Sequence, residues 1–187
     1  KALSYSGIVY SAMGQYDNAL AFDQAAAKQY KLIKDVWGEG ASYNNMGIRY
    51  VYLSKYDSAL ICYQKAIKLF TDNKMEADAS PIYLDIGHIY FVLKQYNKAT
   101  DFYLKGIKTA EKAKDSASIA NGLINYAGVL WSLNEKKKVF PLQKRALQIG
   151  NLMKNSYIIS IASSNLSDLY GDTKNYDSSL VYSKNGK

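Results

Sequence analysis

Apolar residues recur along the chain at the spacing of an α-helix. One face of a predicted helix is formed by Tyr43, Met46, Gly47 and Tyr50, which follow the i, i+3, i+4, i+7 pattern. A polar stretch near Ser54 interrupts the pattern, and a second stripe of the same kind is formed by Leu60, Tyr63, Ile67 and Phe70. This part of the chain therefore predicts two amphipathic helices joined by a turn.

The same pattern returns at one fixed interval without an insertion, and it produces columns of like residues. A small residue fills the first column: Gly7, Gly47, Gly87, Ala127 and Ser167. Three columns follow it: Tyr10, Tyr50, Tyr90, Leu130 and Tyr170; Tyr16, Tyr56, Tyr96, Lys136 and Tyr176; Ala19, Ala59, Ala99, Val139 and Ser179. The small residues predict close helix contacts, because a large side chain there would overpack the pair at a cost of about 1–3 kcal/mol.

One phrase marks the turn inside each repeat. It reads GQYDNAL at 14–20 and recurs at 54–60, 94–100 and 174–180, whereas 134–140 holds NEKKKVF. We interpret the phrase as the junction between two helices. The fourth repeat is expected to keep both helices and to pack more loosely there, since Lys136 replaces the tyrosine and Pro141 follows.

Charged residues also recur at the predicted helix ends. Asp17, Asp57 and Asp177 stand at the start of second helices, where a carboxylate can cap free N–H groups and oppose the positive end of the dipole. Near the ends of those helices stand Lys34, Lys74, Lys114 and Lys154, where a cation suits the negative end of the dipole.

These columns resemble the tetratricopeptide repeat, which places a large residue, Leu-Gly, Tyr, Ala, an aromatic and Ala in that order. The second repeat matches with Tyr43, Met46-Gly47, Tyr50, Ala59, Tyr63 and Ala66. The usual unit has about 34 residues. The longer unit found here resembles those of kinesin light chains and of bacterial sensory and regulatory members. HEAT and armadillo repeats have a similar length but lack this spacing.

The resemblance implies an all-α, right-handed superhelical solenoid of five stacked helix-turn-helix repeats. The repeats fall approximately at 1–35, 36–75, 76–115, 116–155 and 156–187, the last being truncated. Residue 1 is lysine. We therefore expect a single solenoid segment cut from a longer protein.

Composition agrees with this prediction and leaves the compartment undecided. The 187 residues include 18 tyrosines and only two prolines, and 48% are hydrophobic. No apolar run reaches the roughly 20 residues of a membrane span, so we expect no membrane insertion. A single cysteine, Cys62, excludes an internal disulfide and leaves the cytoplasm and the periplasm both open.

Residues that could carry chemistry are sparse. His88 is the only histidine and has no zinc-like ligand set near it in the sequence, and Cys62 is expected to be a small buried apolar residue. The glycines follow helix-contact spacing and form no phosphate-binding loop. We therefore expect no enzyme activity, no catalytic residue, no metal and no cofactor.

Ligand-facing residues are implied by the resemblance. In related repeats an Asn before the Leu-Gly pair binds the backbone of an extended peptide, and the matching column is Asn45, Asp85, Asn125 and Asn165. The remaining groove candidates are Asn44, Tyr52, His88, Phe91, Trp131 and Asp168. Two alternatives stay open: the Asn side chains bond to a neighbouring helix, or Trp131 packs between helices.

Net charge is +8, but the lysines are expected on the outer face of second helices: Lys65, Lys68, Lys98, Lys105, Lys108, Lys112 and Lys144. A groove that carries Asp85 and Asp168 and few cations argues against nucleic acid. We predict a scaffold that binds a protein or extended peptide in its concave groove, as the sensory or interaction part of a larger bacterial signalling protein. The alternative is a structural spacer or a homodimerisation module without a peptide ligand.

Overall fold

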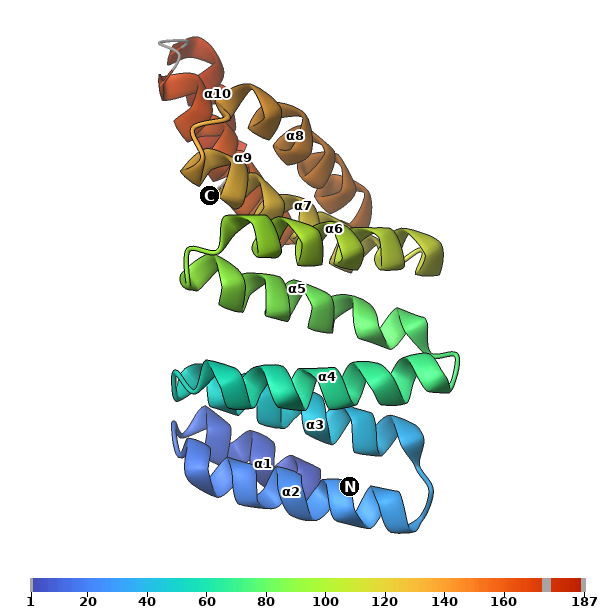
Figure 1. Cartoon of the computed structure of the whole chain (residues 1–187). Helices are drawn as coiled ribbons and strands as arrows, with labels where there is room; N and C mark the ends of the chain where they lie inside the picture. Colours follow the sequence, from blue (N-terminus) through green and yellow to red (C-terminus); the bar gives the residue numbers. More distant parts are fainter. Residues whose placement is uncertain (1, 173–175, 186–187) are drawn as a thin grey trace. The chain divides into compact units, whose positions relative to one another are not determined.

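A computed structural model describes residues 2–172 and 176–185, with the backbone alone at 176–178, 184 and 185. The described residues form ten α-helices and no strand (Figure 1). The helices are α1 (Ala2–Ala12), α2 (Tyr16–Leu32), α3 (Val36–Tyr52), α4 (Tyr56–Asp72), α5 (Glu76–Val92), α6 (Tyr96–Ala113), α7 (Ser116–Ser132), α8 (Lys136–Met153), α9 (Ser156–Asp172) and α10 (Tyr176–Asn185). They form consecutive helix-turn-helix pairs, which confirms the predicted all-α repeat fold.

The chain divides into two compact units, residues 1–82 and 83–187, and the boundary falls within α5. In the first unit α1 packs on α2, α2 on α3, and α3 on α4. In the second unit the same holds from α6 to α10, and α7 also contacts α9. α8 is one helix from Lys136 onward, so the fourth repeat keeps both of its helices despite Pro141, as predicted.

Close helix contacts explain the column of small residues. A Cβ built on Gly47 would lie 2.4 Å from the ring of Tyr63, and one on Gly87 would lie 2.6 Å from the ring of Tyr103. Both tyrosines are 1% exposed and lie on the partner helix of the same pair. A buried tyrosine on the partner helix therefore requires the small residue. The sequence columns predicted a close contact here but did not identify the tyrosine as the partner.

The connections after the first eight helices share one turn geometry. A residue with positive φ recurs at a constant interval, half the length of a repeat: Gly14, Lys34, Ser54, Lys74, Lys94, Lys114, Asn134 and Lys154. At Lys34, for example, the next residue, Asp35, donates its N–H to the carbonyl of Tyr30 at 2.9 Å. Of the two hydrogen bonds in a Schellman motif, this is the one that spans more residues. The lysine column at the helix ends thus occupies a left-handed turn position, in addition to its predicted place near the negative end of the dipole.

Replacing one of these lysines by glycine should stabilise the protein. Lys114 has φ 56°, a conformation that costs a residue with a Cβ about 1 kcal/mol relative to glycine. We expect Lys114→Gly to raise the free energy of unfolding by up to about 1 kcal/mol in urea denaturation. Lys108→Gly, in the exposed interior of α6, is the control and should lower it by about 1 kcal/mol. A loss of stability in Lys114→Gly would contradict this account of the turn.

Side-chain capping occurs at different helices from those predicted. The N-cap residues of α2 and α4 are Gln15 and Lys55, and neither makes a side-chain cap hydrogen bond. The capping prediction for Asp17 and Asp57 is therefore wrong, although both remain in the first turn, where they favour the dipole. The side chain of Asp177 lies outside the described residues.

Side-chain caps are found instead at the start of three helices, each of which is the first helix of its pair. Asp35 accepts from the Gly38 N–H at 2.9 Å at the start of α3. The acceptors at α7 and α9 are Asp115 and Asn155. Because the turn leaves these residues extended just before a helix, their short oxygen-bearing side chains reach the free N–H groups.

Candidate functional site

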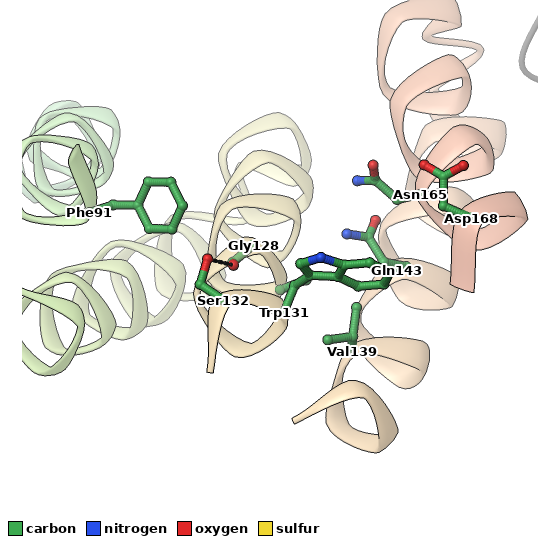
Figure 2. A pocket seen from close by; sticks show the side chains of 9 residues that line it. Phe91, Gly128, Trp131, Ser132, Val139, Gln143, Asn165 and Asp168 are labelled. Atoms are coloured by element: carbon green, nitrogen blue, oxygen red, sulfur yellow. Dashed lines mark hydrogen bonds between the residues drawn. The ribbon is translucent and has the colours of Figure 1, made fainter. Parts of the chain in front are cut away.

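A hollow of about 360 Å³ opens within the second unit, between α5, α7, α8 and α9 (Figure 2). Its lining consists of Phe91, Ala127, Gly128, Trp131, Ser132, Val139, Gln143, Asn165 and Asp168. Figure 2 shows Phe91 on one side of Gly128, and Trp131 with the two α9 side chains on the other. Aromatic walls and a few convergent polar groups are typical of ligand-binding sites in proteins.

The hollow exists because the fourth repeat departs from the other repeats. Gln143 stands where the second and third repeats have the buried rings of Tyr63 and Tyr103. Gly128 stands where they have Ile48 and His88, and a Cβ built on it would meet nothing within 4 Å. The smaller side chains at both positions leave the space open.

Polar side chains line this space, among them Gln143, Asn165 and Asp168. Gln143 is 2% exposed, and its Oε1 has no hydrogen-bond partner among the described residues. Asn165 is half-buried beside it, and Asp168 is exposed at the rim. Asp168 is the only charged residue among those that line the hollow. The hollow therefore offers hydrogen-bond acceptors and a single negative charge.

Trp131 forms one wall and is 39% exposed. The Nζ of Lys136 lies 5.0 Å from the centroid of its ring and also pairs with Asp172 Oδ2 at 2.6 Å. One face of the indole thus already carries a cation–π contact. Ser132 donates its hydroxyl to the carbonyl of Gly128 at 3.0 Å.

The predicted groove residues divide among two hollows and positions outside both. Four of them, Phe91, Trp131, Asn165 and Asp168, are brought together in the hollow, which we name the α5–α9 hollow. Asn45 lines a second hollow of about 320 Å³ in the first unit, with the exposed side chains of Tyr5, Ile8 and Trp37.

The remaining predicted groove residues line neither hollow. Tyr52 is 63% exposed and stacks on Tyr16 with a centroid distance of 4.9 Å. His88 is exposed, Asn125 is half-buried, and Asn44 is half-buried with its Oδ1 unpaired. Gly128 belongs to a column predicted to face the groove, whereas Gln143 and Val139 were not predicted there. Both depart from the residues of the second and third repeats, and that departure could have identified them.

Asp85 is a half-buried carboxyl group with an altered ionisation. Burial raises the pKa of its side chain from 3.8 to about 7. The pKa of the neighbouring phenol of Tyr103 is also raised, by burial first and by the charge of Asp85 second. The second, fourth and fifth repeats carry Asn45, Asn125 and Asn165 at this position, and the first carries Tyr5.

Asp85→Asn should therefore stabilise the protein at alkaline pH. The folded state holds the proton more tightly than the unfolded state, so wild-type stability should fall as the pH rises from about 4 to about 7 and then level off. At pH 8 we expect a gain of about 2–3 kcal/mol, and at pH 4 little change. Urea denaturation across this range checks the slope, with Asp17→Asn, an exposed site, as the control. An equal effect at both pH values would contradict the burial argument.

Cys62 is buried as predicted, and the lysines lie on the surface. All seven lysines predicted on the outer face are exposed, and Cys62 is 5% exposed, with burial raising the pKa of its thiol. Among the described residues, no group of three potential metal ligands comes together. In the same residues, no helix combines the length and apolar character needed to cross a membrane.

Comparisons with known proteins agree with the fold. Two family models described as tetratricopeptide repeat match residues 1–72 and 80–112, together more than half of the chain. No curated protein matches the sequence. Many solved structures resemble the fold, and three of them illustrate its range.

The first is aspartyl phosphate phosphatase F from Bacillus subtilis, with a TM-score of 0.87, 17% identity and coverage of 98% of this chain and 48% of that one. The second is a putative kinesin light chain from Podosopora anserina, with a TM-score of 0.75, 13% identity and coverage of 98% and 92%. The third is a Rap protein complexed with competence and sporulation factor, with a TM-score of 0.71, 10% identity and coverage of 98% and 61%.

The chain spans about half the length of the phosphatase and about three fifths of the Rap protein. At these identities the likeness establishes the fold. The kinesin light chain and the Bacillus subtilis phosphatase share this fold.

Proposed function

Because the chain belongs to the tetratricopeptide repeat family, we propose that it binds an extended peptide or a peptide segment of a partner protein, and that the α5–α9 hollow is a binding site. The observation that carries the proposal is the gathering of Phe91, Trp131, Asn165 and Asp168 in this hollow. A half-exposed indole supplies apolar contact area, and the carboxamide both donates and accepts hydrogen bonds to a peptide unit.

The fold likeness supports the same class of ligand. A Rap protein with this fold has been crystallised in complex with competence and sporulation factor. We extend the proposal to a role in bacterial signalling, in which this segment is the sensory or interaction part of a larger protein. Coding sequence for a kinase or DNA-binding module beside the segment would support this role, and an unrelated neighbour would count against it.

Peptide selection followed by substitution tests the binding site. Peptides selected from a random library against the protein should bind Trp131→Ala at least about tenfold more weakly, because the indole is one wall of the hollow. Asn125→Ala combined with Trp131→Ala should weaken binding no less while the helical circular dichroism stays unchanged. Leu152→Ala, which removes a large side chain that is 85% exposed elsewhere on α8, is the control and should leave affinity unchanged. Equal affinity of Trp131→Ala and wild type would overturn the assignment.

Self-association is the competing function, and light scattering separates the two. A monomer whose selected peptides compete for one site supports peptide binding. A stable dimer that Trp131→Ala dissociates would instead assign this surface to a second copy of the chain.

A further inference from the structure

We propose that the α5–α9 hollow selects an arginine side chain of its partner peptide. The inference rests on the proposed function and specifies which residue of the ligand the hollow recognises. It follows from the unpaired acceptor at the floor, the charge at the rim and the aromatic walls.

The floor of the hollow carries an acceptor that lacks a donor. Gln143 is almost completely buried, since only 2% of it is exposed, and its Oε1 lies without a hydrogen-bond partner among the described residues. An unsatisfied buried acceptor carries an energetic cost, because it has lost its hydrogen bonds to water. The oxygen is shielded from solvent, so the carboxamide must turn toward the hollow before a ligand N–H can reach it. A donor that draws it there removes the cost, so the floor favours donors over acceptors and over purely apolar groups.

The rim has the opposite charge to a guanidinium group. Asp168 is exposed beside Asn165, and no cationic residue lines the hollow, although the whole chain carries a net charge of +8. The nearby ammonium of Lys136 is paired with Asp172 at 2.6 Å. The local field at the rim therefore favours a cationic ligand despite the net charge of the chain.

The walls suit a flat cation. Phe91 and Trp131 stand on either side of Gly128, whose missing side chain leaves the space between them open (Figure 2). The indole already attracts the ammonium of Lys136 at 5.0 Å. A guanidinium group stacks on aromatic faces and presents five donors in one plane, so it can reach the rim carboxylate and a second acceptor together. A lysine ammonium offers a compact point charge without that stacking surface.

Pentapeptides that differ at one residue test the proposal directly. The probes are acetyl-Gly-Ala-X-Ala-Gly-amide, where X is arginine, lysine or citrulline, the neutral analogue of arginine. The chain has two tryptophans, and Trp37 lines the other hollow, so its indole N–H signal is an internal reference for that of Trp131. We expect the arginine peptide to shift the Trp131 signal and to bind about tenfold more tightly than the citrulline peptide. The lysine peptide should fall between them.

Two variants assign the preference to named groups. Asp168→Asn should weaken the arginine peptide about fivefold and leave the citrulline peptide unchanged. Ala127→Gly with Gln143→Tyr should abolish measurable binding, because it recreates the Gly–Tyr contact of the second and third repeats and fills the hollow. That pair is already accommodated twice in this chain, so the fold should be retained, and circular dichroism checks this.

The outcomes separate this inference from the proposed function. Equal affinity for the arginine and citrulline peptides, or an unchanged preference in Asp168→Asn, overturns arginine selection. If the Trp131 signal moves only with library peptides that lack basic residues, the hollow binds peptides but arginine selection is wrong. If no selected peptide depends on Trp131, the proposed function fails as well.

Discussion

Arg49→Val is expected to lower the free energy of unfolding by about 3–5 kcal/mol at neutral pH. Arg49 on α3 is 7% exposed, and its Nε lies 3.5 Å from Oδ2 of Asp23 on α2, which is fully buried. Neither carboxylate oxygen of Asp23 has a hydrogen-bond partner among the described residues. Removal of the guanidinium group would leave a buried carboxylate with no compensating charge.

The loss should depend on pH. Burial raises the pKa of Asp23 to about 6, and the charge of Arg49 opposes that rise. The folded state therefore binds the proton more tightly than the unfolded state, and wild-type stability should fall as the pH rises from about 4 to about 6. Without Arg49 the pKa moves higher, so the slope should extend above pH 6. Urea denaturation at pH 5 and pH 8 should give the smaller loss at pH 5.

A double substitution provides the control for the ion pair. Two repeats further along the chain, the equivalent positions hold Tyr103 and Val129, which pack in one apolar cluster in the second unit. Asp23→Tyr with Arg49→Val copies this pair into the first unit, where Gly7 stands opposite position 23 just as Gly87 stands opposite Tyr103. The double variant should be about as stable as wild type, or more stable. If it were as unstable as Arg49→Val, the loss would not arise from the stranded carboxylate.

Gly47→Leu should lower stability by about 3 kcal/mol or more, and it is the second substitution with a large expected effect. A Cβ at this position would lie 2.4 Å from Cε1 of Tyr63, a ring that is 1% exposed and so has no room to move. The branched side chain would force α3 and α4 apart. Thermal unfolding followed by circular dichroism measures the loss.

Milder variants keep this prediction testable if Gly47→Leu fails to fold. Gly47→Ala should be destabilised by about 1 kcal/mol or more, and Tyr63→Gln in that background should recover part of the loss, because it recreates the Ala127–Gln143 pair of the fourth repeat. Gly128→Ala is the matched control. It adds the same methyl group where nothing lies within 4 Å and should raise stability by up to about 1 kcal/mol. Similar effects at Gly47 and Gly128 would contradict the contact argument.

The helices and their pairing could be predicted from sequence because they depend on spacing alone. The spacing of Tyr43, Met46 and Tyr50 indicates one helix face, and this does not depend on which residues they contact. The left-handed turns could not be predicted, since Lys34 and its equivalents have side chains that do not favour positive φ. The neighbouring helices impose that backbone conformation, and only the resulting hydrogen bonds reveal it.

Only part of the α5–α9 hollow could be predicted, because some of its lining residues are recognisable only from their neighbours in the fold. Aromatic and amide columns on first helices led to Phe91, Trp131 and Asn165, because each lies on the same face of its helix. Gln143 comes from a second helix, and it became a candidate because it replaces a tyrosine and because its Oε1 has no donor among the described residues. The ion pair of Asp23 and Arg49 was not predicted for the same reason. The hydrophobic pattern of each helix gives no indication that these two side chains face each other. In each case the residue departs from its column, and this departure is the signal to search for in repeat sequences.

The uniform turn also bears on how the chain could have gained its repeats. The backbone returns to the same geometry after every half repeat, whereas the sequence returns only after a whole one. Two turns that lie one full repeat apart have the same backbone geometry and are followed by the same pattern of side chains. Adding or removing one helix pair between two such turns would therefore keep the remaining repeats in register.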